Sequence, residues 1–288
     1  MTEAKRQDGW VGSLQVVIAV GVALFLVLPL LVIFPMAFSN AERLTFPPPG
    51  YSLELYRKLF SSEPWLSAIA MSFQVGMLAA VIATVFGVPA SYAIVRFQFV
   101  GKRLLYALLL TPLVVPVIII ALSLFLTFAP MQLIGNRLAL AMGHALLGIP
   151  FVVVMTTSVL RDFDIKLEHA ARSLGATWWR TFLHVTLPGI RSGVFLGAFT
   201  AFAVSFDEVI LVIFIGGRTA NTLPRQIWGG IRTSLDPVIP AVSVLLITAV
   251  FLAFVMVWAR QLAVARARRR KAIETAWAER VPELAPLA

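Results

Sequence analysis

Six apolar runs, each long enough to cross a lipid bilayer as a helix, constrain the fold of this chain more than any other feature. They cover residues 13–38, 66–95, 104–128, 138–160, 192–215 and 238–259. A hydrocarbon core about 30 Å thick requires about 20 helical residues. Charged residues make up only 13% of the chain, against about 25% in soluble domains. The sequence therefore predicts an all-α membrane protein with six transmembrane helices.

Positive charge is distributed unevenly among the connections between these runs. Seventeen of the 24 Lys and Arg residues lie in the N-tail, in residues 96–103, in residues 161–191 and in the C-tail from Arg260. The other three connections hold seven. Because positive residues accumulate in cytoplasmic loops, we predict that both termini and the 161–191 loop are cytoplasmic. Residues 1–12 then form an N-tail and residues 260–288 a basic C-tail.

The predicted transmembrane domain covers residues 13–259. Its first run has about 26 residues, too many for a signal-peptide core, and no small-residue cleavage pattern follows, so we interpret it as a retained membrane helix. Residues 39–64 are expected to form a folded external loop, since Pro47-Pro48-Pro49-Gly50 cannot continue a helix. The basic run at residues 266–271 is expected to lie near anionic membrane lipid, in a solvated, topology-fixing role.

Proline and small residues mark irregular and close-packed positions within the runs. Gly193 with Gly197, and Gly76 with Ala80, have the four-residue spacing that lets helices approach closely. The following prolines predict bends or broken turns: Pro29, Pro35, Pro89, Pro112, Pro116 and Pro150.

The loop at residues 161–191 is polar and mostly helix-compatible. Residues 166–174 predict about two and a half helical turns, ended by Gly175, and Trp178 and Trp179 begin a second short segment. Two interpretations follow from these residues. The loop forms a compact protrusion that another protein binds, or it forms an amphipathic hairpin whose Trp side chains lie at the lipid headgroups.

The spacing within this loop resembles a known family motif. His169-Ala170-Ala171, then three residues, Gly175, nine residues and Val185-Thr186-Leu187-Pro188 resemble the EAA loop of ABC importer permeases. Glu168 lies one place before His169, which occupies the family's glutamate position, and adjacent helix positions point about 100° apart. The resemblance implies that Glu168, His169, Ala170, Ala171 and Gly175 form the region that couples to an ATPase subunit.

Further motifs extend the resemblance to much of the chain. Gly87-x-Pro89-Ala90-Ser91-Tyr92-Ala93 and Ser205-Phe206-Asp207-Glu208 look like the second permease of spermidine/putrescine-type ABC importers. The resemblance implies a multi-pass protein of the bacterial inner membrane, without catalytic residues of its own. The implied partners are a second homologous permease, two ATPase subunits that carry ATP and Mg, and an extracytoplasmic substrate-binding protein.

The implied cargo is a small cationic solute, with polyamine favoured. The alternatives within the same kind of complex are an opine, an amino-acid derivative or an organophosphonate. A more distant alternative is an ion-coupled secondary carrier, which would account for carboxylates in the membrane but would leave the 161–191 loop without a purpose.

Two adjacent carboxylates lie about 16 residues into the fifth run, at Asp207 and Glu208. Keeping both charged within the membrane costs roughly 5–7 kcal/mol, so a partner or a transport pathway is expected. We predict that Asp207, Glu208 and Tyr92 contribute to the substrate pathway. The alternatives are pairing with an arginine of the partner permease, capping of a broken half-helix, or an external position if the helix boundary is shifted.

Several classes of site are excluded or disfavoured by residue content. The chain has no Cys, its three His residues lack metal-ligand spacing, and no phosphate-binding G-x-x-x-x-G-K-[ST] motif is present. No basic patch interleaved with aromatic residues occurs in a soluble segment, so we predict no nucleic-acid partner. Gln74 and His144, within the second and fourth runs, are expected to make helix–helix hydrogen bonds in preference to ligand contacts.

Overall fold

A computed structural model describes residues 4–233, 235–253, 255–256 and 258–260, with side chains from residue 12 onward. The described residues are predominantly helical and include no β-strand, only an isolated bridge between Ser39 and Tyr51. The chain divides into two compact units, one formed by residues 1–59 and 235–288 and the other by residues 60–234. The predicted C-tail beyond Arg260, including residues 266–271, lies outside the described residues.

The first unit contains helices joined by a folded loop. Helix α1 (Ala4–Ala37) includes an apolar stretch of 26 residues, and the segment Ile239–Arg260 is also long and apolar enough to cross a membrane. The loop after α1 turns back on itself, since Asn40 N donates to Gly50 O at 3.1 Å. It leads into α2 (Glu54–Ser61), which buries Leu55 and Leu59.

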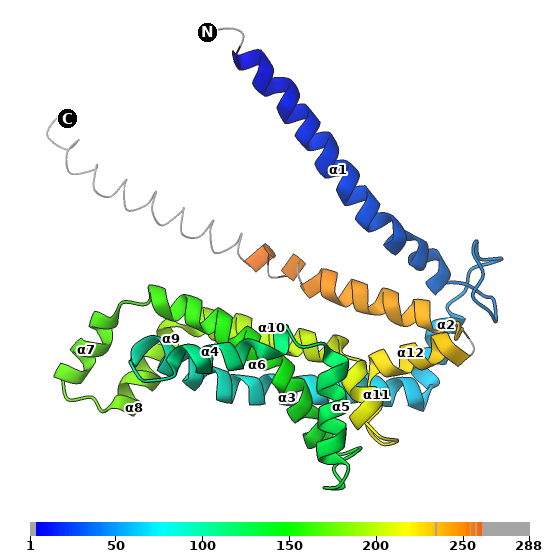
Figure 1. The fold of residues 1–288 in the computed structure, drawn as a ribbon. Coiled ribbons are helices and arrows are strands. Elements are labelled where there is room, and N and C mark those ends of the chain that lie inside the picture. Colours follow the sequence, from blue (N-terminus) through cyan, green and yellow to red (C-terminus); the bar gives the residue numbers. More distant parts are fainter. Residues whose placement is uncertain (1–3, 234, 254, 257, 261–288) are drawn as a thin grey trace, which may run out of the picture. The chain divides into compact units, whose positions relative to one another are not determined.

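The second unit is built on three helices that pack along one another: α3 (Glu63–Arg96), α6 (Arg137–Asp162) and α10 (Arg191–Asp207). The remaining elements are α4 (Lys102–Leu110), the 3-10 turn η1 (Thr111–Leu113), α5 (Val117–Phe128), α7 (Ile165–Ser173), α8 (Trp178–Thr181), the π-helical turn η2 (Phe182–Thr186), α9 (Leu187–Gly189), α11 (Ile210–Ile215) and α12 (Leu223–Thr233). Figure 1 shows α7 and α8 at one end of this unit and α11 and α12 at the other.

Glycine allows two of the central helices, α6 and α10, to approach closely. A methyl group added at Gly197 would lie 2.8 Å from Val152 Cα, and one at Gly193 would lie 2.9 Å from Met155 O. Both contacts are with the α6 backbone, which cannot move aside as a flexible side chain could. The close helix crossing predicted from Gly193 and Gly197 is therefore confirmed.

Two of the predicted spans are broken. The run at 104–128 divides into Lys102–Leu113 and Val117–Phe128, which meet at 100°. Pro112 and Pro116 lie at this break and cannot donate backbone hydrogen bonds. The run at 192–215 is interrupted after Asp207, because Glu208 is extended (φ −78°, ψ 119°) before α11 begins.

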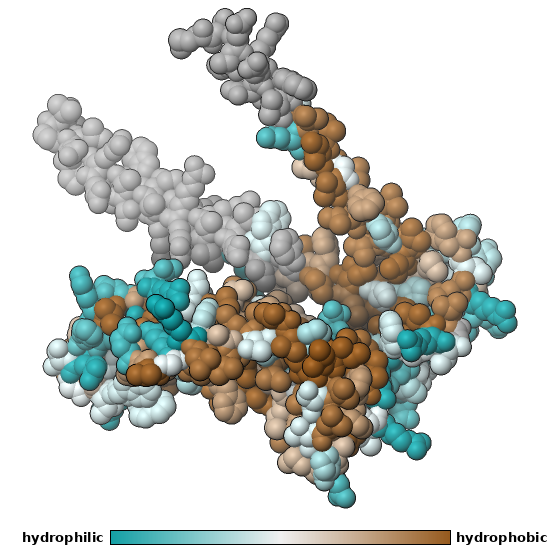
Figure 2. Space-filling view, in the orientation of Figure 1, coloured by the Kyte–Doolittle hydropathy of each residue, from teal (hydrophilic) through white to brown (hydrophobic). Residues whose placement is uncertain are grey.

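Within the described ranges, four helices are long and apolar enough to span a membrane, and up to six are if each sharply bent pair counts as one span. The second such pair is Trp178–Gly189 with Arg191–Asp207, which meet at 75°. By contrast with the break near Pro112, helices α1, α3 and α6 continue through Pro29, Pro35, Pro89 and Pro150. Membrane helices tolerate such prolines where neighbouring groups satisfy the freed carbonyls. In the second unit, Figure 2 shows apolar side chains along the helices and hydrophilic ones around α7 and α8.

Candidate coupling surface and its buried anchor

Helix α7 is a short helix with a defined start and end. Asp164 caps its N-terminus by accepting a hydrogen bond from Lys166 N at 2.9 Å, as acidic N-cap residues commonly do. The chain leaves the helix at Gly175, whose φ of +87° lies in the left-handed region that favours glycine. The helix and the glycine stop predicted for residues 166–175 are thus confirmed.

The residues assigned to ATPase coupling divide between two faces of α7. His169, Ala170 and Gly175 are exposed, and Ala171 is half-buried. Glu168 points the other way and is only 5% exposed. Leu174, next to the exposed set, is 89% exposed. One histidine, three small residues and one exposed leucine therefore form the outer face, which we call the coupling surface (His169, Ala170, Ala171, Leu174 and Gly175).

Glu168 is held by two residues from the end of α3. Arg96 contacts Glu168 Oε1 with two nitrogens, Nη2 at 2.9 Å and Nε at 3.0 Å. Tyr92 donates its hydroxyl hydrogen to Glu168 Oε2 at 3.0 Å. Arg96 Nη2 also donates to the carbonyl oxygen of Phe163 at 3.1 Å. We call the set of Tyr92, Arg96 and Glu168 the anchor, because it ties α7 to the end of a core helix.

Aromatic rings enclose the anchor. The Tyr92 ring lies 5.7 Å from that of Trp178 and 5.2 Å from that of Phe182, both edge-to-face. Trp178 and Phe182 stack on each other at 5.9 Å. Aromatic pairs in these arrangements stabilise packing beyond simple area burial. The segment after Gly175 therefore packs on the end of α3, and with the anchor it fixes α7 from two sides.

Tyr92 and Arg96 illustrate what the sequence leaves undetermined. The sequence assigns Tyr92 to the substrate pathway, whereas the structure places it against Glu168, beside α7. In the sequence, Arg96 counts only as a topology-determining charge. It lies 72 residues before its partner, and no sequence spacing links two residues so far apart. Its only signal is a basic residue at the predicted cytoplasmic end of a span.

The two carboxylates in the fifth run have different surroundings. Glu208 Oε1 accepts hydrogen bonds from Ile210 N at 2.6 Å and Leu211 N at 3.1 Å, which caps the start of α11. Asp207 is exposed at the end of α10, and its side-chain carboxylate makes no hydrogen bond or ion pair within the described ranges. Among the alternatives open from the sequence, capping of a half-helix is the arrangement observed for Glu208.

Two other polar residues within the membrane runs pair between helices. His144 of α6 lies with Nδ1 2.8 Å from Ser205 Oγ of α10, and Gln74 of α3 accepts from Arg137 Nη1 at 3.0 Å. The helix–helix hydrogen bonds predicted for His144 and Gln74 are confirmed. The part of the chain that the structure describes contains no group of three or more His, Cys, Asp or Glu residues able to hold a metal ion.

Similarity to known proteins agrees with this geometry. Residues 83–269 match the family described as "Binding-protein-dependent transport system inner membrane component". The chain belongs to this family. It is accordingly an inner-membrane permease, and the resemblance seen in its motifs is confirmed.

Curated relatives include two polyamine permeases of Escherichia coli strain K12. The permease is 31% identical to the putrescine transport system permease protein PotI, over 81% of this chain and 85% of PotI. It is 29% identical to the spermidine/putrescine transport system permease protein PotC, over 83% of this chain and 89% of PotC. It is also 30% identical to the molybdate/tungstate transport system permease protein WtpB of Pyrococcus furiosus, over 70% of this chain and 83% of WtpB. All three relatives are transport system permease proteins.

Solved structures share the fold. A bacterial ABC transporter involved in the import of the acidic polysaccharide alginate aligns with a TM-score of 0.70 at 18% identity, over 88% of this chain and 96% of that chain. The alginate ABC transporter in complex with a pentasaccharide-bound periplasmic protein aligns with a TM-score of 0.68 at 16% identity, over 87% and 93% of the two chains. The predicted all-α permease fold is thus confirmed.

Proposed function

We propose that this permease forms half of the translocation pathway of an ATP-driven importer for a small cationic solute, with polyamine as the cargo class. A second, homologous permease supplies the other half, and two ATPase subunits, which bind ATP and Mg, dock from the cytoplasm. An extracytoplasmic binding protein delivers the cargo. Similarity to PotI and PotC supports the cargo class.

One observation carries the coupling part of this proposal. The coupling surface on α7 is exposed, while the opposite face of the same helix is fixed to α3 through a buried ion pair. A displacement imposed on the exposed face would therefore reach α3 directly. In this arrangement Glu168 acts as a positioning residue behind the coupling surface, and His169, Ala170 and Gly175 meet the ATPase subunit.

The orientation of the chain follows from the same argument. The coupling surface must face the compartment that contains ATP, which agrees with the positive charge counted in residues 161–191. Both termini then lie in the cytoplasm, and the α11–α12 end of the second unit faces outward.

The cargo pathway is proposed to include Asp207 but not Glu208. Glu208 already accepts two backbone hydrogen bonds. Asp207 is an exposed carboxylate at the C-terminal end of α10, where the helix dipole disfavours negative charge. A carboxylate at this electrostatically unfavourable position favours a role toward a cation, and it would attract an ammonium group strongly in a partly desolvated path.

Reconstitution tests the function. The complete importer in proteoliposomes should take up labelled putrescine or spermidine only with ATP and a cargo-loaded binding protein, and vanadate should stop uptake. Ala170→Asp should leave the importer assembled but separate ATP hydrolysis from uptake. Val100→Asp is the matched control, because Val100 is fully exposed on the α3–α4 loop, outside α7. Uptake that persists with vanadate and without ATPase subunits would instead indicate an ion-coupled carrier.

An anion is the second candidate cargo, and one of the similar proteins favours it. WtpB, a molybdate/tungstate permease protein, is about as similar to this chain as PotI and PotC are. Competition assays with an organophosphonate, an opine, an amino-acid derivative and molybdate, against labelled polyamine, would identify the cargo. Uptake of an anion with no polyamine uptake would overturn the cationic assignment and leave the permease function intact.

A further inference from the structure

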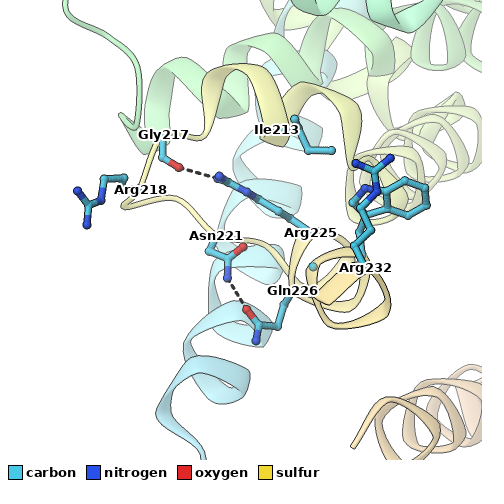
Figure 3. Close-up of a pocket in the computed structure, with 9 residues that line it drawn as sticks. Ile213, Gly217, Arg218, Asn221, Arg225, Gln226 and Arg232 are labelled. Atoms are coloured by element: carbon cyan, nitrogen blue, oxygen red, sulfur yellow. Dashed lines mark hydrogen bonds between the residues drawn. The ribbon is translucent and has the colours of Figure 1, made fainter. Parts of the chain in front are cut away.

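A cavity of about 510 Å³ opens between α11 and α12, at the end of the second unit opposite α7 (Figures 1 and 3). Three arginines line it, Arg218, Arg225 and Arg232, and its lining includes no Asp or Glu. Asn221, Gln226 and Trp228 complete its polar and aromatic lining. We call this cavity the arginine pocket.

Arg225 is the central residue of the pocket. Its Nη1 donates to the carbonyl oxygen of Gly217 at 2.6 Å, which fixes the guanidinium across the cavity, as Figure 3 shows. Its side chain is half-buried, and this burial lowers the pKa of Arg225, because removal from water disfavours the charged form. Neither of the two ion pairs found within the described ranges includes Arg225. Among the described residues, Arg225 is thus a partly desolvated positive charge without a counter-ion.

The residues around Arg225 add positive charge and fix the shape of the pocket. The Arg232 guanidinium carbon lies 5.0 Å from the centre of the Trp228 ring, within the range of a cation–π contact. Asn221 Nδ2 donates to Gln226 Oε1 at 2.6 Å, which holds the loop before α12 against the helix. Arg218 is exposed and extends outward from the other side of the cavity.

This chemistry selects an anion and excludes a cationic cargo. Three arginines would repel an ammonium group, so the pocket does not extend the polyamine path proposed near Asp207. The planar guanidinium matches a carboxylate in a two-point contact. The pocket also combines arginine with tryptophan, two residue types that are enriched among the residues contributing most to protein–protein binding.

We propose that the arginine pocket receives a carboxylate side chain of the extracytoplasmic binding protein. The proposal rests on the proposed function, which places the α11–α12 end outside the cytoplasm. The family depends on a binding protein, and a protein that docks at this end would bring acidic side chains to an opening lined by arginine. Positive charge at the rim of the pocket would also raise the rate at which an acidic surface of the binding protein associates with the permease.

Binding of the cargo-loaded binding protein to the complete importer tests the assignment. The importer is placed in nanodiscs of neutral phosphatidylcholine, and the dissociation constant is measured at low and at physiological salt. Arg225→Gln is expected to weaken binding about tenfold or more, as loss of one partner of a desolvated charge pair does. Arg225→Lys, which keeps the charge but not the planar fork, should be weakened less.

Two further variants separate docking from misfolding and from general charge loss. Arg232→Gln removes an exposed charge of the pocket and should weaken binding about threefold, in an importer that elutes as one assembled species. Arg137→Gln is the matched control. Arg137 begins α6 two residues after Gly135, whose N–H donates to Ile215 O at the end of α11, and it lies outside the pocket. This control variant should leave the dissociation constant within about twofold of wild type. A charge-swap test identifies the partner residue. Arg225→Glu is combined in turn with replacement of each surface carboxylate of the binding protein by Arg, and one of these pairs should restore binding.

Each contrary result has a distinct meaning. Equal affinity of wild type and Arg225→Gln overturns the assignment. A defect confined to discs that contain phosphatidylglycerol would assign the pocket to a lipid headgroup, and an altered KM for cargo at unchanged affinity would assign it to cargo. A wild-type importer without binding-protein-stimulated ATP hydrolysis would refute the proposed function itself.

Discussion

Arg96 and Glu168 form a two-nitrogen ion pair, at 2.9 and 3.0 Å, between the last residue of α3 and the inner face of α7. Their side chains are only 10% and 6% exposed. A hydrogen bond from Tyr92 occupies the other carboxylate oxygen. The helix that presents the coupling surface is therefore joined to the transmembrane core by a satisfied, buried contact.

Breaking this pair should uncouple the permease. Glu168→Gln leaves Arg96 buried without its counter-charge, and removal of one partner of a buried pair typically costs about 3–5 kcal/mol. We expect a lower midpoint of thermal unfolding, together with ATP hydrolysis no longer matched to uptake. Uptake per ATP hydrolysed, measured in proteoliposomes, checks the second effect.

Two comparisons make this prediction specific. Glu54→Gln is a control, since the Glu54–Lys58 pair is exposed at 3.6 Å and pairs of this kind contribute only about 0.3–0.5 kcal/mol. The exchange Arg96→Glu with Glu168→Arg should recover part of the coupling lost in either single variant. Full coupling in Glu168→Gln would show that the anchor has no role in transmission.

Proline at Gly175 should disturb the coupling surface without preventing insertion. Proline is restricted to φ near −65° and cannot adopt the +87° found at Gly175. The hydrogen bond from Gly175 N to Arg172 O would also be lost. We expect an assembled importer in which the binding protein no longer stimulates ATP hydrolysis.

Gly101→Pro is the matched control for this change. Gly101 has a similar φ of +86° and lies on the α3–α4 loop, and at both glycines nothing lies within 4 Å of an added methyl group. Equal loss of stimulated ATP hydrolysis in both variants would mean that general backbone strain, and not the coupling surface, is responsible.

Substitution of Asp207 should mainly reduce transport, whereas substitution of Glu208 should mainly reduce stability. Asp207→Asn is expected to reduce polyamine uptake with little change in unfolding temperature, because the Asp207 carboxylate has no partner within the described ranges. Glu208→Ala removes the cap of α11, which typically costs about 0.5–2 kcal/mol, and should mainly lower the unfolding temperature. Initial uptake rates and thermal melts of both variants check this, and a reversed pattern would exchange the two roles.

A methyl group at Gly197 should weaken the contact of α6 with α10. It would lie 2.8 Å from Val152 Cα, and overpacking of this kind costs about 1–3 kcal/mol. Gly197→Ala should therefore lower the unfolding temperature of the purified permease. Gly21→Ala in α1 is the control, because nothing lies within 4 Å of its added methyl, and its unfolding temperature should not fall.

The interruptions of the spans were only partly predictable. Pro112 and Pro116 predicted the break between α4 and α5, because proline removes a backbone donor wherever it lies. Nothing comparable marks the break after Asp207. There α10 ends at Asp207, and Glu208 accepts hydrogen bonds from the first backbone N–H groups of α11. This contact depends on the extended backbone at Glu208, which the sequence does not specify. Pro89 and Pro150 show the opposite case, since α3 and α6 continue through both.

The all-helical membrane class, the short helix of the 161–191 loop and its glycine stop follow directly from the order of the residues. These features depend on local hydrophobicity, on helix propensity and on the backbone freedom of glycine. Each of these is a property of a short stretch of residues. Three further features are visible only in the folded chain: which side of α7 faces outward, the contacts of Tyr92 and Arg96 with Glu168, and the cavity that three arginines near α12 line. These relationships join residues that are brought together by helix packing, and packing is a property of the folded chain that no local pattern encodes.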